Sequence, residues 1–338
     1  MSAISVIDPF NVVHDAKMPF LAQALHPEVV QQQFDRLSLW QNTHPVELQA
    51  IRVIRYKPGR RCLIEYDVVE NQSVVTLIGK ARAKGLDHCS FRLLQLLWHN
   101  GFDRDSCDRI SVPEPIGVIP QLQMWLQRKI AGTVTTNLLP QSSGIALSQQ
   151  IAQAAYKLHQ ANIVPRRSHT MADELQILRD RLGKVVQLYP HLSQRIERLL
   201  MACDRLGAAT PELDNSGIHR DFYPDQVLVA GDRIYLLDLD LYCIGTPSLD
   251  IGNFIAHVTE QSLRTLGNAD ALIDREEAAI AEFTRLSSSA TRVAIQAYKT
   301  LSLARHIYIS TLFPERQRFT ETLLELCEQR LCVACHCV

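Results

Sequence analysis

Polar and acidic residues flank a short predicted β-hairpin in the second half of this 338-residue chain. The two hairpin strands are the apolar runs 227–229 and 234–237. The residues before the first strand and after the second are His219, Arg220, Asp221, Gln226, Asp238 and Asp240. Because an antiparallel hairpin brings its two open ends together, we expect both groups at one place. Carboxylate and amide oxygens gathered in this way can bind Mg²⁺, and a carboxylate can take a proton from a hydroxyl group.

These residues match the parts that phosphoryl transfer to a hydroxyl group requires. The reaction needs metal ligands, a cation that fixes the phosphates, and a carboxylate that orients the acceptor. The spacing from His219-Arg220-Asp221 to Gln226 matches the kinase catalytic loop H-R-D-x-x-x-x-N except at its last position. Asp238 stands where kinases keep the aspartate of Asp-Phe-Gly. The pattern therefore predicts transfer of a phosphoryl group from ATP.

The segment 219–250 resembles the aminoglycoside phosphotransferase and choline kinase superfamily. The family pattern is roughly H-x-D-x-x-x-x-N, a hairpin, and then I-D-x-x-x-x-x-G-x-x-x-x-D, whose second half corresponds here to Leu237-Asp238, Gly245 and Asp250. Residues 154–163, AAYKLHQANI, look like the family's leucine-histidine helix end, and residues 113–117, PEPIG, look like its approach to the hinge. The resemblance covers about residues 48 to 315. It implies an enzyme that uses ATP and Mg²⁺ to phosphorylate a hydroxyl group of a small molecule.

The resemblance also implies a two-lobed, protein-kinase-like α+β fold. We expect a small antiparallel β N-lobe at 1–128 and a larger, mainly helical C-lobe at 129–338, with the catalytic hairpin at 218–250. The N-lobe would hold a lead-in with a helix, a nucleotide-binding antiparallel sheet, a helix and a further strand, at 1–45, 48–56, 62–69, 74–83, 91–99 and 122–127. The C-lobe would hold acceptor-binding helices, of which the clearest patterns lie at 147–161, 171–188 and 191–206.

By resemblance, Asp221 is the catalytic base or the group that orients the acceptor hydroxyl. Asp238 is expected to hold Mg²⁺. Asp240 is either a second metal ligand or a surface or capping residue. His219 is expected to pack behind the loop, and Asp250 to hold the loop backbone as a structural acid.

On the nucleotide side, Lys80 lies late in the third strand, where a kinase fold places the lysine that contacts the α- and β-phosphates. Arg82 and Lys84 are alternatives, because alternation along the strand puts them on the same face.

Two further regions are candidates for nucleotide contacts. The basic turn 57–61, which contains Arg60, either covers the phosphates or is an ordinary hairpin turn. The backbone around Arg128 and Ile130 is expected, by resemblance, to meet the adenine edge.

Two departures from the family pattern leave an alternative function open. Gln226 replaces the asparagine that usually binds the second metal ion, and the helix after Lys80 offers only Asp87 as an acidic partner. The alternative is a catalytically weak, kinase-like nucleotide-binding or interaction protein. A protein kinase is disfavoured, since the hairpin is short and no Ala-Pro-Glu segment follows it.

Composition narrows the class of protein further. Hydrophobic residues make up 46% and charged residues 21% of the chain, and the net charge is −1, which gives no case for a nucleic-acid partner. The N-terminal residues lack a basic region before an apolar run, and no apolar stretch reaches about 18 residues. We therefore expect neither a secretory signal nor a membrane span, and place the protein in the cytoplasm. The sequence does not indicate the oligomeric state.

The sequence allows more than one interpretation of the C-terminal tail and of the acceptor molecule. Cys332 to His336 spells C-x-x-C-H, a haem-attachment pattern that also suits zinc or redox chemistry, but we expect a cysteine-rich helix end without either. The acidic residues Asp274, Glu276, Glu277 and Glu282 suit either a cationic aminoglycoside or a solvated helix face. Sugars, amino alcohols and nucleosides are equally open as acceptors.

Overall fold

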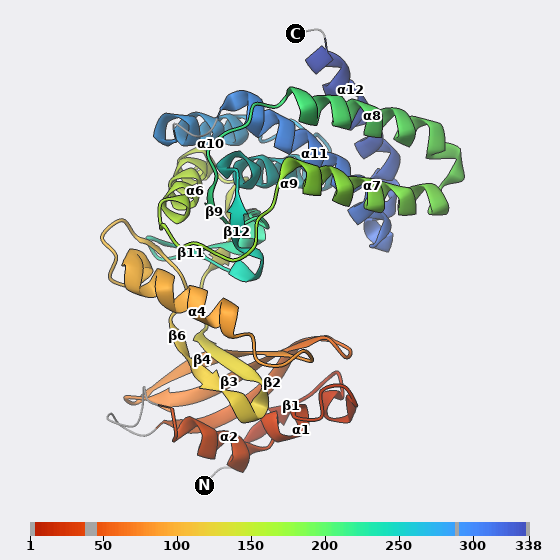
Figure 1. The fold of residues 1–338 in the computed structure, drawn as a ribbon. Coiled ribbons are helices and arrows are strands. Elements are labelled where there is room, and N and C mark those ends of the chain that lie inside the picture. The colour runs from red at the N-terminus through yellow and green to blue at the C-terminus, as the bar shows by residue number, and fades with distance from the viewer. Residues whose placement is uncertain (1–3, 38–45, 288–290, 336–338) are drawn as a thin grey trace. The chain divides into compact units, whose positions relative to one another are not determined.

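The computed structural model describes residues 4–37, 46–287 and 291–335 (Figure 1). The chain divides into two compact units, Met1–Ala131 and Gly132–Val338. Each unit has its own hydrophobic core. No helix in the described part of the chain is long and apolar enough to cross a membrane. The cysteine-rich C-terminal motif lies outside the description, which omits residues 336–338 and the side chains of 332–335.

The first unit is built on a six-stranded sheet with the order β1-β2-β3-β4-β7-β6. Neighbouring strands are antiparallel, except that β1 runs parallel to β2. The strands are β1 Ser5–Ile7, β2 Glu47–Lys57, β3 Arg61–Glu70, β4 Ser73–Arg82, β6 Pro115–Ile119 and β7 Met124–Arg128. The predicted three-strand meander is thus confirmed as β2, β3 and β4. β1 was not predicted, since it is only three residues long. The unit also contains β5, Ile110–Ser111.

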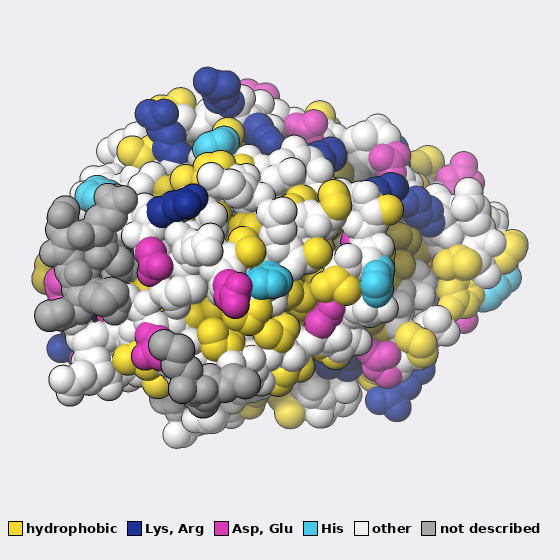
Figure 2. All heavy atoms as spheres, turned by 90° about the horizontal axis from the view of Figure 1, so that it is seen from below, with side chains coloured by type: hydrophobic (Ala, Val, Ile, Leu, Met, Phe, Trp, Pro, Cys, Tyr) yellow, Lys and Arg dark blue, Asp and Glu magenta, His cyan; other side chains and the backbone are white. Residues whose placement is uncertain are grey.

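Helices cover both faces of this sheet (Figure 1). On one face lie α1, Leu21–Ala24, and α2, Pro27–Phe34, where the Tyr66 hydroxyl donates to Ala24 O at 3.0 Å. On the other face lies α4, His88–Leu97, with Phe91 and Trp125 ring centroids 5.9 Å apart. Several large apolar side chains of the first unit are exposed, among them Val6, Phe10 and Val74. Figure 2 shows hydrophobic side chains on one face of the molecule.

The second unit is mainly helical. Its helices are α5 Thr135–Leu138, α6 Gly144–His159, α7 Met171–Leu188, α8 Ser193–Ala209, α9 Pro247–Leu266, α10 Ile273–Leu286, α11 Arg292–Thr311 and α12 Thr320–Cys335. α11 packs against α9, α7 and α12, and α10 packs against α6. The three helices predicted in the first part of this unit are confirmed as α6, α7 and α8.

Short strands interrupt the helices where the polar residues were predicted to gather. β10, Val227–Ala230, and β11, Arg233–Leu236, form the antiparallel hairpin, and β8, Thr133–Val134, pairs with β10. β9, Ser216–Ile218, pairs antiparallel with β12, Cys243–Gly245. The loop from β9 to β10 and the turn after β11 are therefore both anchored by strands.

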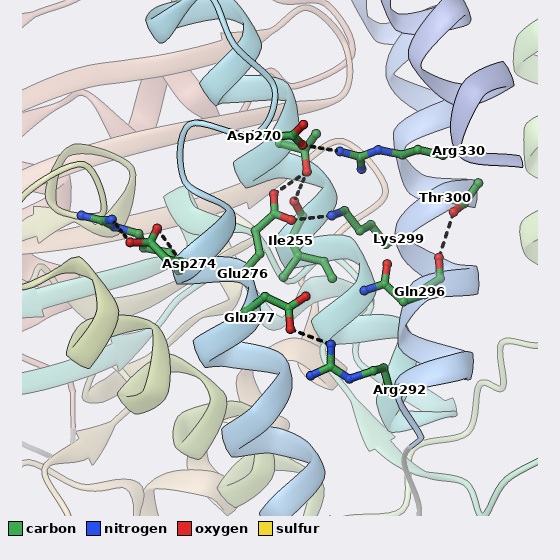
Figure 3. A network of polar contacts seen from close by, with 12 residues as sticks. Ile255, Asp270, Asp274, Glu276, Glu277, Arg292, Gln296, Lys299, Thr300 and Arg330 are labelled. Carbon is green, nitrogen blue, oxygen red and sulfur yellow. Dashed lines mark hydrogen bonds and ion pairs between the residues drawn. The ribbon is translucent and has the colours of Figure 1, made fainter. Parts of the chain in front are cut away.

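A buried ion pair joins α10 to α11 in the second unit (Figure 3). Lys299 Nζ contacts Glu276 Oε2, and Glu276 Oε1 accepts a hydrogen bond from the Thr259 hydroxyl on α9. Both charged side chains are buried, and burial lowers the pKa of Lys299, although Glu276 opposes this change. A second pair in the same figure, Glu277 with Arg292 at 2.6 Å, lies at the surface. The helical packing therefore contains one buried and one exposed ion pair on adjacent residues of α10.

We predict that Glu276→Gln destabilises the protein far more than Glu277→Gln. The first change leaves the Lys299 charge buried without a counter-ion, which typically costs about 3–5 kcal/mol. The second removes an exposed pair, worth about 1 kcal/mol or less. Urea unfolding of both variants measures the difference, and equal losses of stability would show that the Glu276–Lys299 pair does not hold α10 to α11.

Candidate active site

The loop after β9 is fixed by the buried carboxylate of Asp250, in the first turn of α9. Asp250 Oδ2 accepts hydrogen bonds from His219 N and from His159 Nε2, both at 2.8 Å. Asp250 Oδ1 accepts from Arg220 N at 2.7 Å. The side chain is 0% exposed, and a carboxylate removed from water is stable only when its oxygens are bonded in this way. One side chain thus ties together the end of α6, the loop after β9 and the start of α9.

His219 connects the two sides of the hairpin. Its Nε2 lies 2.8 Å from Leu237 O, and because a carbonyl only accepts, this nitrogen carries the proton. Leu237 directly precedes Asp238, which adopts a left-handed backbone conformation with φ 52° and ψ 55°. Arg220 is also left-handed, with φ 69°. Such conformations are costly for residues other than glycine, so the surrounding bonds must hold both turns.

Further backbone contacts place Gln226 beside Asp238. Leu237 N donates to Gln226 O at 2.9 Å, so the residue before Asp238 is joined to the end of the catalytic loop. The middle of the loop is held by Asn253 of α9, whose Nδ2 donates to Phe222 O at 3.0 Å. The loop is therefore fixed along its length, from His219 to Gln226.

The phenol of Tyr223 lies where these side chains converge. Burial raises the pKa of Tyr223, and the negative charges of Asp221, Asp225 and Asp238 raise it further. Gln226 Nε2 donates to the phenolic oxygen at 3.1 Å. Carboxylates affect a neighbouring group in this way only at short range. Gln226 therefore contacts the phenol directly, and Asp221 lines the same pocket as Tyr223.

The oxygens at this place fit a magnesium ion. Asp238 has a carboxylate, and the Gln226 amide, whose nitrogen donates to Tyr223, has an oxygen of the kind that binds a cation. Asp240 follows in the 3₁₀ turn Leu239–Leu241. No group of three or more His, Cys, Asp or Glu side chains that could hold a metal ion occurs among the described residues. Mg²⁺ typically takes one or two carboxylates and completes its shell with phosphates and water, which suits this donor set.

A pocket of about 340 Å³ opens beside Asp221, wholly within the second unit. Its wall combines the catalytic loop, α9, α11 and the 3₁₀ turn Pro314–Phe319. These elements supply Asp221, Tyr223, His257, Arg305, His306 and Arg316, among others. A volume of this size fits a small ligand, so the pocket can present a hydroxyl group to Asp221.

Three of the aromatic rings that line the pocket contact one another in sequence. Tyr223 stacks on His257 with 4.6 Å between ring centroids, and His257 meets His306 edge to face at 4.3 Å. Burial lowers the pKa of His306 to about 3, and the positive charges of Arg305 and Arg316 contribute to this shift. Burial and the same two arginines hold the pKa of His257 well below its usual value. Both imidazoles are therefore neutral at pH 7.

The acidic residues of α10 already have cationic partners. Asp274, Glu276, Glu277 and Glu282 pair with Arg275, Lys299, Arg292 and Arg285. Hydrogen bonds from Arg285 and Gln153 lower the pKa of Glu282 to about 2. Glu276 and Glu282 are buried, so the expectation of a solvated helix face is wrong for these two residues. The four acids are engaged within the fold rather than gathered for a cationic acceptor.

In the first unit, Lys80 lies on the half-exposed face of β4. Its Nζ is 4.8 Å from the ring centroid of Trp125 on β7, the neighbouring strand. Arg82, the alternative two residues on, forms an ion pair with Asp87 at 2.9 Å. Lys84 follows the end of the strand. α4 contains no glutamate, as the sequence indicated.

The turn that contains Arg60 is held by the lead-in segment. Gly59, with φ 59°, donates its N–H to Asp15 Oδ2 at 2.7 Å, and the Tyr56 hydroxyl donates to the same oxygen. The positive charge of Arg61, together with partial burial and Arg55 and Arg60, lowers the pKa of Lys57. The turn is therefore strongly cationic, but the Gly59 amide is already occupied. Any phosphate contact there would depend mainly on the arginine side chains.

Arg128, the last residue of β7, has several polar partners. Its guanidinium pairs with Glu114 at 2.6 Å and Glu70 at 2.9 Å, and its N–H donates to Glu114 O at 2.9 Å. The Lys129 N–H donates to Thr76 O at 2.8 Å. The N–H groups of Arg128 and Lys129 are therefore engaged. An adenine contact in this segment would use the Arg128 carbonyl or the backbone of Ile130.

Several residues of the site were not identified from the sequence: Tyr223, His257, Arg305, His306 and Arg316 in the pocket, and His159 as an anchor of the loop. His159 belongs to the leucine-histidine helix end, so that motif carried a usable signal. Tyr223 lies within the loop, and the other pocket residues come from helical segments in which single polar residues have no recognisable spacing.

The sequence matches the phosphotransferase enzyme family over residues 66–283, which is more than half of the chain. A search of curated proteins finds no match. Among solved structures, the chain is similar to a choline/ethanolamine kinase family protein from Mesorhizobium loti, with 14% identity, a TM-score of 0.58, and coverage of 90% of this chain and 94% of that one. It is also similar to choline kinase from Cryptosporidium parvum, with 13% identity, a TM-score of 0.56, and coverage of 90% and 95%. A third similar structure is a glucosamine kinase in complex with glucosamine, ADP and inorganic phosphate, with 13% identity, a TM-score of 0.57, and coverage of 90% and 82%.

These structural similarities confirm the protein-kinase-like α+β fold that the sequence predicted, the fold of small-molecule phosphotransferases. The chain belongs to the phosphotransferase enzyme family. It is therefore a phosphotransferase enzyme, as the resemblance implied.

We predict that Asp250→Asn loosens the catalytic loop. The amide group cannot accept hydrogen bonds at both of its ends, so at least one of the His219 and Arg220 amides loses its acceptor. Loss of a charge-assisted bond in a buried site costs about 1.5–3 kcal/mol. Hydrogen exchange of the peptide that spans β9 and the loop should quicken relative to the rest of the chain. Asp204→Asn, in a surface pair on α8, is the control. Exchange that is no faster than in this control would show that Asp250 does not hold the loop.

Proposed function

We propose that the enzyme transfers the γ-phosphoryl group of ATP to a hydroxyl group of a small molecule, with Mg²⁺ as its cofactor. The pocket that Asp221 and Tyr223 line together, with Gln226 hydrogen-bonded to the Tyr223 phenol, carries the proposal. Similar folds support nucleotide use: the glucosamine kinase structure contains ADP, and a TM-score 0.51 match is a GDP and kanamycin complex. Glucosamine and kanamycin also support a small acceptor that carries hydroxyl groups.

In this proposal, Asp221 accepts a hydrogen bond from the acceptor hydroxyl and directs its oxygen toward the γ-phosphorus. As the new O–P bond forms, the bond from the γ-phosphorus to the bridging oxygen breaks, ADP leaves, and Asp221 takes the proton. Asp238 and the Gln226 amide oxygen would hold Mg²⁺, with Asp240 as a second candidate ligand, and the ion would neutralise charge on the phosphates. His219 and Asp250 keep the loop in place through the hydrogen bonds described above.

We assign nucleotide contacts to the first unit. Lys80 would bind the α- and β-phosphates, the Arg60 side chain would add positive charge, and the backbone at Arg128 and Ile130 would meet the adenine. Residues 1–128 would thus act as the nucleotide-binding lobe and 129–338 as the acceptor-binding lobe. A nucleotide-binding protein without turnover is the competing function, because Gln226 replaces asparagine and α4 has no glutamate.

We predict that Asp221→Asn lowers the turnover number by about 10²–10⁴, the usual contribution of a positioned general base. The affinity for Mg-ATP should stay nearly unchanged, because the carboxylate acts on the acceptor. Initial rates and calorimetric titration with Mg-ATP measure the two effects, with Asp232→Asn in the exposed hairpin turn as the matched control. If Asp221→Asn retains most of the turnover, Asp221 has no part in the transfer.

We predict that Gln226→Leu raises the Mg²⁺ concentration needed for half-maximal turnover much more than it lowers the melting temperature. Leucine lacks the amide oxygen, whereas Gln226→Asn keeps it on a stem shorter by about 1.5 Å, one carbon–carbon bond. Asparagine should therefore be partly active, since it cannot keep both the bond to Tyr223 and the same oxygen position. Magnesium titrations of the rate compare the two variants. Full activity of Gln226→Leu with an unchanged magnesium dependence would remove Gln226 from the metal site.

A further inference from the structure

The pocket beside Asp221 has an acidic side and a basic side. On one side, Asp221 and Asp225 line the pocket together with Tyr223. On the other side, Arg264, Arg305 and Arg316 line it together with His306. Tyr223 and His306 are separated only by the ring of His257, which contacts both. One small molecule can therefore reach both sides.

The basic side has hydrogen-bond donors to spare. Arg264 is paired with Glu260 at 3.2 Å, and Arg305 binds Asn253 Oδ1 at 2.6 Å and Glu174 at only 3.4 Å. Arg316 forms no ion pair with any residue that the structure describes, and its guanidinium lies over the Phe313 ring at 4.8 Å. A half-buried arginine without a carboxylate partner is well suited to bind an anionic ligand.

His306 supplies an independent indication of a ligand. It is 2% exposed and lines the pocket, yet neither ring nitrogen has a hydrogen-bond partner in the described part of the chain. A buried polar group left unpaired costs about 1–3 kcal/mol. Since the ring is neutral, it has one N–H to donate, and a ligand oxygen beside Arg305 and Arg316 could accept it.

We propose that the acceptor carries an oxyanion, a carboxylate or a phosphate, in addition to the hydroxyl group that it presents to Asp221. The oxyanion binds Arg305, Arg316 and the His306 N–H, and the hydroxyl lies at the acidic side of the pocket. A cationic acceptor would place its charge against two arginines, which disfavours aminoglycosides and amino alcohols bound in this orientation. The inference rests on the proposed function and specifies its substrate class.

The test uses acceptors that share one carbon skeleton and differ in charge: glycerate and glycerol 3-phosphate, neutral glycerol, and cationic serinol. Rates are measured with the wild type, with Arg316→Gln and with Arg318→Gln. Arg318 lies in the same 3₁₀ turn but over the Phe319 ring and outside the pocket, so it is the matched control. We expect the anionic acceptors to be preferred, with KM raised about tenfold or more in Arg316→Gln alone, as for loss of a charge-assisted hydrogen bond. In Arg316→Gln the KM of glycerol should rise less than that of the acids, and Arg318→Gln should match the wild type for every acceptor. The better of the two acids distinguishes carboxylate from phosphate.

The other possible results distinguish failure of the oxyanion site from failure of the proposed phosphoryl transfer. If glycerol or serinol is preferred, or if Arg316→Gln affects glycerol as much as the acids, the oxyanion site is wrong while phosphoryl transfer stands. If no compound, nor any in a wider panel of hydroxyl acceptors, is phosphorylated in an Asp221-dependent reaction, the proposed function fails. The pocket is then judged by calorimetric titration of glycerate and glycerol 3-phosphate with ADP and Mg²⁺ present. Binding that depends on Arg316 but not Arg318 keeps the oxyanion site, and absence of such binding overturns it.

Discussion

The site depends on one buried charge, the carboxylate of Asp250. With no exposure to water, it needs donors, and it obtains them from His159 and from the consecutive backbone amides of His219 and Arg220. Two amides aimed at one carboxylate require the chain to turn sharply, and Arg220 takes a left-handed conformation that costs about 1–2 kcal/mol. The charge-assisted bonds, each worth about 1.5–3 kcal/mol, offset that cost. The hydrogen bonds to Asp250 thus fix the backbone conformation of the two residues before Asp221.

Asp250 can act in this way because α9 is itself fixed. At Gly252 a Cβ atom would lie 2.8 Å from the backbone nitrogen of Lys299, so the absence of a side chain allows α9 to approach α11 closely. Asp250, Asn253 and His257 follow at helical spacing, three and then four residues apart, and therefore share one face of α9. The first two hold the catalytic loop and the third lines the pocket. α9 therefore packs against α11, positions the catalytic loop and forms part of the pocket wall.

The sequence predicted many of the strands and helices and the hairpin, because these features are local or follow a recognisable pattern. Strand alternation predicted β2 to β4, and helical periodicity predicted α6 to α8. The two apolar runs between Asp221 and Asp238 predicted the hairpin of β10 and β11. The pocket could not be predicted in this way. Arg305 and Arg316 line it together with the catalytic loop only because of how α11 and the turn after it pack. The contact of Asp15 with the Gly59 turn was missed for the same reason: no local pattern links residues so far apart in the chain.

The central claim is that Asp221 acts on the acceptor, so that the phosphoryl group passes from ATP to the hydroxyl oxygen in one direct step. The stereochemical course at phosphorus tests this claim most directly. The enzyme would be given ATP whose γ-phosphate is chiral by isotopic labelling, and the configuration of the phosphorylated product would be determined. A single in-line transfer predicts inversion of configuration. Retention would mean two successive transfers through a phosphorylated enzyme group, and would contradict the role assigned to Asp221.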